Sequence, residues 1–158
     1  MKSWMLAAVI ALMMSPAVAE DAEVPHPDGY RHWFHVKSMV IEEGHPLYAA
    51  FGGIHHIYAN DEALQGYRSD AFPDGAVLVF DLLEAEHADH AVTEGERKVV
   101  GVMHKNAARY PNTGGWGFEG FAGGDPNTRV VGSEAESACF ACHAPLADSD
   151  YVFSRLRD

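Results

Sequence analysis

The chain has 158 residues, two cysteines and a formal net charge of -12. A chain of this length accommodates one domain, and its acidic balance disfavours nucleic acid and anionic membranes through charge repulsion. A basic protein partner would be tolerated.

The first residues have the pattern of a secretory signal. Lys2 precedes the apolar stretch Trp4–Met14, and small residues follow up to Ala19, where cleavage is predicted. The apolar stretch is shorter than the roughly 20 residues that span a bilayer, which argues against a retained membrane anchor. We therefore expect a signal peptide over residues 1–19 and a single domain, exported to the periplasm, over residues 20–158.

Beta-branched and aromatic residues predict four strands. The ranges are Tyr30–Ile41, Ile54–Ala59, Ala76–Leu83 and Lys98–Lys105. In the third strand, Leu78, Phe80 and Leu82 share one face because side chains alternate along a strand. Its other face is also mainly apolar, which is typical of a central strand or of one that lines a pocket.

Polar and turn-forming residues between the strands predict a helix and loops. Asn60 offers a side-chain cap for a short helix over residues 61–67. Phe72–Gly75 is a turn, and the acidic segment Glu84–Glu96 is expected to be a loop. The alternation of aromatic and small residues in Gly114–Phe121 favours a strand against which something flat packs closely.

Residues 139–143 form the pattern C-x-x-C-H. At this spacing two thiols reach the two vinyl groups of one haem, while the next residue presents an imidazole to the iron. A disulfide is the usual state of two cysteines in an exported protein, but the spacing and the adjacent histidine argue against it. The motif predicts one haem c attached covalently to Cys139 and Cys142, with His143 as the proximal iron ligand. Residues 20–158 are therefore expected to form a single haem-binding cytochrome domain. Bacteria attach c-type haem outside the cytoplasm, in agreement with the predicted export.

The C-terminal region is expected to be mainly helical. Ser133 and Glu136 form an S-x-x-E capping box, which predicts a helix that carries the haem cysteines in its last turns. Residues 148–156 are expected to be helical or a tight turn. The predicted fold class is α+β, a mainly antiparallel β-sheet with a few short helices and the haem motif near the C-terminus. A four-helix cytochrome would need long amphipathic stretches, which the sequence lacks.

An ordered set of motifs resembles the cytochrome P-460 family. The motifs are Ile57–Asn60, Phe72–Val77, Arg109–Asn112, Gly115–Phe118, and the C-x-x-C-H pattern followed by Asp150–Phe153. The resemblance covers nearly all of residues 20–158 and implies a sheet-rich, usually homodimeric fold. The family includes enzymes that oxidise hydroxylamine and non-enzymatic relatives, the cytochromes c-prime-beta, which bind nitric oxide or carbon monoxide.

The resemblance is closest to cytochrome c-prime-beta. The enzymes depend on a lysine cross-linked to the porphyrin, and the matching position here is Phe80, which has no amine. An aromatic cap over the open iron face would exclude water and favour small, weakly polar ligands. Phe51 resembles a second such cap. The alternative for both residues is ordinary core packing.

Other residues are candidates with alternatives. His55 matches a basic distal-side residue of the enzymes, so it could hydrogen-bond a ligand or a haem propionate. Arg109 could contact a propionate or form a surface ion pair. Coordination of the iron by Met39, Met103 or His104 would instead give a six-coordinate electron carrier.

The leading hypothesis is a mono-haem cytochrome with five-coordinate iron and an apolar distal pocket. It would bind nitric oxide or carbon monoxide for gas sensing, buffering or detoxification, without catalytic residues. The alternatives are a hydroxylamine-oxidising enzyme of the P-460 type and an electron-transfer cytochrome. The expected partners are a small diatomic gas, an unidentified redox protein and a second copy of the chain, with no nucleic acid and no membrane.

Overall fold

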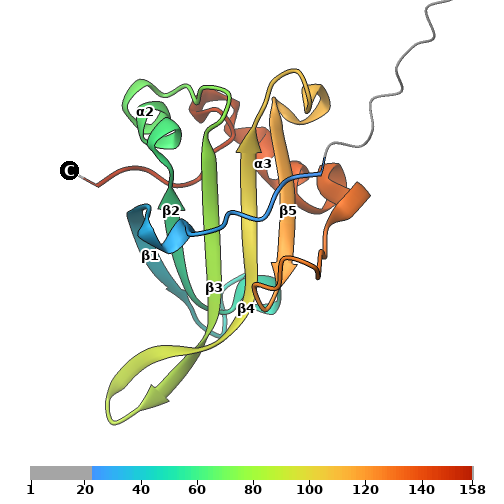
Figure 1. The fold of residues 1–158 in the computed structure, drawn as a ribbon. Coiled ribbons are helices and arrows are strands. Elements are labelled where there is room, and N and C mark those ends of the chain that lie inside the picture. Colours follow the sequence, from blue (N-terminus) through green and yellow to red (C-terminus); the bar gives the residue numbers. More distant parts are fainter. Residues whose placement is uncertain (1–22, 158) are drawn as a thin grey trace, which may run out of the picture.

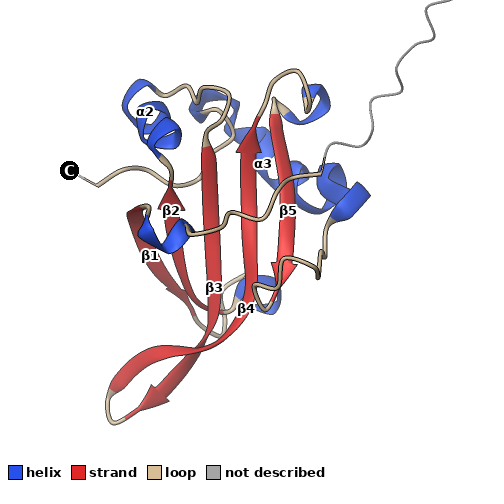
Figure 2. Ribbon diagram, viewed as in Figure 1, coloured by secondary structure: helices blue, strands red, loops and turns tan. Residues whose placement is uncertain are grey.

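The computed structural model describes residues 23–157, and the predicted signal peptide lies outside them. Five strands form one antiparallel sheet in chain order (Figures 1 and 2). They are β1 (Phe34–Ile41), β2 (Gly53–Ala59), β3 (Val77–Ala88), β4 (Ala91–Lys105) and β5 (Trp116–Ala122). The predicted α+β class with a mainly antiparallel sheet is confirmed.

Short helices join the strands and follow the sheet. They are η1 (Tyr30–His32), α1 (Tyr48–Phe51), α2 (Asp61–Ser69), η2 (Pro111–Thr113), η3 (Gly132–Glu134), η4 (Glu136–Phe140), α3 (Ala141–His143) and η5 (Ala144–Ser149). Within residues 23–157, every helix is too short or too polar to cross a membrane.

The sheet has two covered faces, which we name by the part of the chain that packs on them. On the N-terminal face, Val79, Val102 and Phe121 pack with Val24 and Tyr30. The C-terminal face packs against α2 and the chain after residue 134; its core contains Ala59, Leu78, Trp116, Phe118 and Val152. In Figure 1 the blue N-terminal segment crosses in front of the sheet, and the orange C-terminal helices lie behind it. This arrangement explains why β3 is apolar on both sides.

One charged residue interrupts the apolar N-terminal face of β3. Asp81 is 2% exposed, and its carboxylate accepts hydrogen bonds from Arg97 Nε at 2.6 Å and from the Tyr30 hydroxyl at 2.8 Å. A buried charge is tolerated when its oxygens are paired in this way.

The prediction of a loop over Glu84–Glu96 is wrong. Here β3 and β4 continue as a hairpin that projects beyond the sheet (Figure 1). Asp89 and His90 form its turn with φ values of 50° and 63°, as a two-residue type I′ turn requires. The hairpin is polar because it is largely exposed to solvent, and this composition resembles that of a loop.

The two predicted helix caps have opposite outcomes. The Asn60 cap is confirmed, since its Oδ1 accepts a hydrogen bond from the Ala63 N–H at 2.9 Å. The capping box is wrong, because helical structure begins at Gly132 and Ser133 lies inside it. Glu119 of β5 takes the capping role, accepting hydrogen bonds from the N–H groups of Val131 at 3.0 Å and Gly132 at 3.3 Å.

Replacement of Gly53 tests the close contact between β2 and β3. Gly53 has a φ of 126°, and a Cβ there would collide with the Leu83 carbonyl oxygen. Gly53→Ala is expected to lower the free energy of unfolding by about 3 kcal/mol, measured by urea denaturation. Gly44→Ala is the control, because Gly44 has a φ of 96° but open space around its Cβ position. It should cost about 1–2 kcal/mol, and equal losses would contradict the crowding.

Candidate functional site

The C-x-x-C-H segment lies against β5 on the C-terminal face. Phe118 of β5 contacts Phe140, and its ring centroid lies 5.1 Å from that of His143. Both cysteines are free thiols; Cys139 is partly buried and Cys142 is exposed. Burial raises the pKa of Cys139 to about 11, with a smaller contribution from the Glu119 carboxylate. The segment therefore presents two uncommitted thiols beside an imidazole, the donor set for a covalently attached haem.

One backbone hydrogen bond orients the His143 ring. Its Nδ1 lies 2.7 Å from the carbonyl oxygen of Tyr151. A carbonyl can only accept, so Nδ1 carries the proton and Nε2 keeps a lone pair for a metal. Burial lowers the pKa of His143, and the hydrogen bond to Tyr151 offsets this only in part. The side chain is therefore prepared as a neutral ligand.

The three residues predicted for a distal pocket lie together on the C-terminal face. The rings of His55 in β2 and Phe80 in β3 have centroids 4.6 Å apart. Phe51, at the end of α1, meets Phe80 edge to face at 5.7 Å. Residues from three separate elements thus form one aromatic cluster. The three residues are not neighbours in the sequence, so local sequence patterns do not show that their rings are in contact.

Two glycines, which have no side chains, lie beside this cluster in the sheet. Gly101 of β4 pairs with Phe80 on one side and with Gly120 of β5 on the other. A Cβ at Gly101 would lie 3.5 Å from Phe80 Cβ, and one at Gly120 would lie 2.8 Å from Val130 Cγ2. Side chains of Val130, Val99 and Val131 therefore already pack closely over Gly120. That something flat packs against β5 stays a prediction.

Exposed apolar side chains surround the same region. Phe51, Val130 and Phe153 are 40%, 57% and 62% exposed, and the Phe153 ring lies 4.9 Å from that of His143. Large exposed apolar side chains in one area indicate a binding surface. The available Nε2 of His143, the two free thiols and this apolar rim fit a haem.

His55 is a buried histidine with an unused nitrogen. It is 5% exposed, and among the described residues its Nδ1 has no hydrogen-bond partner. Burial, together with the charges of His56 and Lys37, lowers the pKa of His55 to about 4. The ring is therefore neutral at pH 7 and has capacity to hydrogen-bond a group placed next to it.

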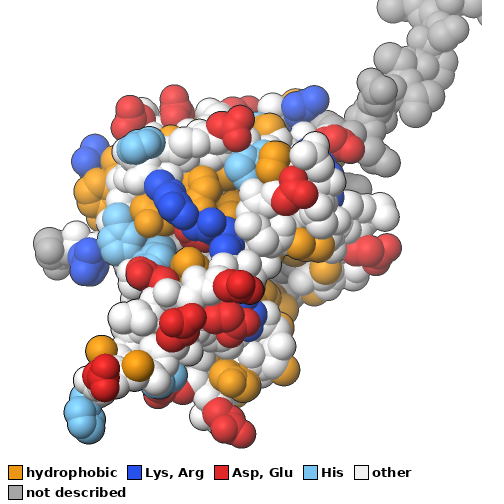
Figure 3. Space-filling model, turned by 60° about the horizontal axis from the view of Figure 1, so that its bottom comes forward, with side chains coloured by type: hydrophobic (Ala, Val, Ile, Leu, Met, Phe, Trp, Pro, Cys, Tyr) orange, Lys and Arg blue, Asp and Glu red, His pale blue; other side chains and the backbone are white. Residues whose placement is uncertain are grey.

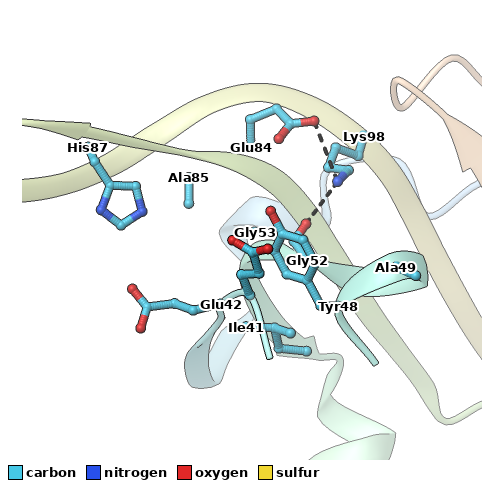
Figure 4. A pocket seen from close by; sticks show the side chains of 11 residues that line it. Ile41, Glu42, Tyr48, Ala49, Gly52, Gly53, Glu84, Ala85, His87 and Lys98 are labelled. Atoms are coloured by element: carbon cyan, nitrogen blue, oxygen red, sulfur yellow. Dashed lines mark hydrogen bonds and ion pairs between the residues drawn. The ribbon is translucent and has the colours of Figure 1, made fainter. Parts of the chain in front are cut away.

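Lys98, which the sequence analysis did not connect with the site, holds α1 in place. Its Nζ donates to the Gly52 carbonyl at 2.8 Å and lies 3.5 Å from Glu84 (Figure 4). Gly52 directly follows Phe51, so this bond fixes the end of α1 that carries the aromatic ring to Phe80. Nothing in the local sequence around Lys98 signals this contact, because it joins β4 to the β1–β2 connection.

An open pocket of about 420 Å³ lies beside this contact (Figure 4). Glu42, Glu43 and Glu84 line it, together with Tyr48 and His87. Three carboxylates suit neither an apolar macrocycle nor its propionates. The pocket therefore lies at the side of α1 and is not the haem site.

Arg109 and His104 lie away from the cluster around Phe80. Arg109 is exposed, and its charge lowers the pKa of His104, although burial of the imidazole is the larger cause. The His104 ring packs near Tyr110, which belongs to the N-terminal face. The structure thus does not bring Arg109 or His104 to the residues around His143.

The two methionines considered as iron ligands are on the C-terminal face. Met103 packs into its core and pairs with Phe118, the residue that contacts His143. Met39 pairs with His55 from the edge strand and is 42% exposed. Met103 is therefore on the His143 side, and Met39 lies at the margin of the sheet.

The sequence matches the Cytochrome P460 family over residues 27–154. The chain belongs to this family. The matched range contains all five strands and the C-x-x-C-H segment, so the resemblance inferred from the motifs is confirmed and the protein is a haem cytochrome. No curated protein matches the chain significantly in sequence. The closer resemblance to cytochrome c-prime-beta stays a prediction.

The lowered pKa of His55 predicts a pH-dependent stability. Its pKa falls from 6.5 to about 4 on folding, so the unfolded chain binds more protons in this range. This contribution is complete above about pH 6.5 and is lost as the pH falls towards 4. In urea titrations, His55→Leu should therefore show a weaker decline of the unfolding free energy over this range. His32→Leu, at an exposed position, should keep the parent's decline. An unchanged decline in His55→Leu would contradict burial of a neutral ring.

Proposed function

We propose that this cytochrome is a periplasmic gas-binding protein with one haem c attached through Cys139 and Cys142. His143 is the proximal ligand, and the opposite coordination position is left to nitric oxide or a similar diatomic. When bound, the haem supplies the iron that takes up the gas. The observation that carries the proposal is the cluster of Phe51, Phe80 and neutral His55 on the same face as His143.

The cluster favours a diatomic gas over charged molecules because a ligand must lose its hydration to enter an apolar site. The two phenylalanine rings offer no donor or acceptor that could replace the hydration of an anion or of a charged amine. Entry of such a molecule would cost several kcal/mol, whereas a diatomic gas has little hydration to lose. His55 has an unused nitrogen and could hydrogen-bond a bound gas. These properties favour sensing, buffering or detoxification of a gas.

A homodimer is part of the proposal. The family resemblance suggests it, and the edge strand β1 exposes Phe34, Met39 and Val40 at 48%, 42% and 43%. Unpaired strand edges with apolar side chains favour association. Sedimentation equilibrium of the haem-loaded protein should give twice the chain mass, and a single-chain mass would remove the dimer from the proposal.

The redox partner is proposed to be basic. The chain has a net charge of -12, and acidic side chains gather near the projecting hairpin in the view of Figure 3. Long-range attraction between opposite charges speeds encounter and weakens as salt screens it.

Coordination of the ferrous iron is the decisive test. The recombinant haem-loaded protein should show a five-coordinate high-spin spectrum at neutral pH, and nitric oxide or carbon monoxide should bind directly. Intact mass should rise by one haem, and replacement of both cysteines by alanine should abolish this covalent addition. A six-coordinate low-spin ferrous spectrum with little affinity for carbon monoxide would refute the proposal and favour an electron-transfer cytochrome.

The alternative is a hydroxylamine-oxidising enzyme, which requires a lysine cross-link to the porphyrin. Phe80 occupies the matching position, but Lys37 lies in the same row of the sheet, since both residues pair with Ile57. Peptide mapping of the haem fragment should therefore look for a covalent bond between Lys37 and the porphyrin. Lys37 bound to the porphyrin, together with a red-shifted reduced spectrum, would support the enzyme; ordinary c-type bands and a free Lys37 would reject it.

Phe80→Ala tests the distal cap. Removal of the ring should speed association of carbon monoxide, measured by flash photolysis. Stability should fall by less than the roughly 3–5 kcal/mol of a fully buried phenylalanine, because Phe80 is only partly buried. Val79→Ala is the matched control: Val79 is adjacent, fully buried and on the N-terminal face. It should destabilise the protein without changing carbon monoxide association. If Phe80→Ala also leaves association unchanged, Phe80 is a core residue only.

A further inference from the structure

Two consecutive residues with unusual backbone geometry carry the carbonyl that orients His143. Asp150 and Tyr151 have φ values of 49° and 65°, in the left-handed region that residues with a side chain seldom occupy. Tyr151 provides the carbonyl that accepts the Nδ1–H of His143 at 2.7 Å. Strain of this kind persists only where surrounding contacts impose it, and such residues concentrate at functional sites.

The contacts that impose this geometry meet at Asp150. Its Oδ1 accepts from Lys105 Nζ at 2.6 Å, and its Oδ2 accepts from the Phe72 N–H at 2.8 Å. Its backbone carbonyl accepts from Trp116 Nε1 at 2.8 Å. All three oxygens of Asp150 are therefore held, by residues of β4, β5 and the turn before β3.

Lys105 is itself buried and fixed. It is 8% exposed, and its Nζ also donates to the Gly114 carbonyl at 2.9 Å and lies 5.0 Å from the centre of the Trp116 ring. Gly114 has no Cβ, and one would collide with the ring of Tyr151. Residues at the β4–β5 connection thus contact both residues of the left-handed turn: Lys105 binds Asp150, and Gly114 lies against the Tyr151 ring.

We infer that Lys105 and Asp150 are positioning residues that press the Tyr151 carbonyl against His143 and so set the donor strength of the imidazole. The inference rests on the proposed ligation of iron by His143. A hydrogen bond from the second ring nitrogen makes a metal-bound imidazole more basic and fixes its orientation. A more basic proximal ligand stabilises ferric iron relative to ferrous iron, and it strengthens the iron–histidine bond.

A purely structural role is the competing explanation. A buried ion pair is weak evidence for stability, because its desolvation cost can exceed the attraction between the charges. The pair of Arg97 and Asp81 makes the comparison direct. It has the same 2.6 Å contact, with a buried carboxylate where Asp150 is partly buried, but it lies on the N-terminal face with Tyr30.

The experiment compares Lys105→Met and Asp150→Asn with Arg97→Met in the haem-loaded protein. Asparagine keeps the size of aspartate and tolerates the left-handed region, so Asp150→Asn should fold. Both variants should shift the iron–histidine stretching band of the ferrous protein to lower frequency and make the reduction potential more positive. The double variant should shift no further than the larger single shift, because both residues act through one carbonyl. Arg97→Met should lower thermal stability but leave the band and the potential at the parent values.

The opposite result is equally clear. If Lys105→Met and Asp150→Asn keep the parent's band and potential while losing thermal stability as Arg97→Met does, the ion pair is structural only. The reduction potential can be measured whether the parent iron is five- or six-coordinate. A six-coordinate parent would therefore overturn the proposed function, whereas unshifted potentials in the two variants would overturn this inference.

Discussion

The hydrogen bond between His143 Nδ1 and the Tyr151 carbonyl is the contact on which the site depends. It selects the tautomer that leaves Nε2 for a metal, and it ties the C-x-x-C-H segment to the chain that follows it. The chain returns to His143 through the left-handed residues Asp150 and Tyr151, which directly follow η5. Since that conformation is strained, polar contacts from the sheet must hold it.

The sheet fixes the relation between the two sides of the site. Phe118, which touches His143, and Gly120 are both on β5 and lie two residues apart. Gly120 belongs to the row that leads through Gly101 to Phe80. Two residues of a strand span about 7 Å, so the His143 contact and the row that leads to the aromatic cluster lie about 7 Å apart along β5. Residues on strands keep such spacing better than residues on loops; His55 and Phe80 of the aromatic cluster are on strands, and Phe51 is on α1.

Neutrality is the shared electrostatic property of the site. Burial keeps His55 and His143 in their neutral forms, and the rings of Phe51 and Phe80 add no charge. The charged groups of the region are held by specific partners, as Lys98 is by Gly52. Carboxylates gather instead in the neighbouring pocket at the side of α1, which Glu42, Glu43 and Glu84 line. The interior therefore suits an uncharged ligand although the whole molecule is strongly acidic.

The sequence predicted those parts of the fold whose signals are local. The Asn60 cap and the alternation in β3 involve residues within a few positions of each other, and both are present in the structure. The hairpin over Glu84–Glu96 was missed because an exposed two-stranded ribbon buries neither face and so leaves no hydrophobic alternation. The Ser133 cap failed because helical structure begins one residue earlier, at Gly132, where Glu119, distant in sequence, accepts from the Val131 and Gly132 N–H groups.

By itself the sequence determined the family, the C-x-x-C-H donor set and the absence of an amine at position 80, because each is a matter of residue identity and spacing. The tertiary structure decided which residues share the site. It joined Phe51 and His55 to Phe80, separated Arg109 from them, and brought Lys105 and Asp150 to the turn beside His143. Those contacts depend on strand register and on the chain's return after η5. Both arise from the packing of distant segments, which no short stretch of sequence encodes.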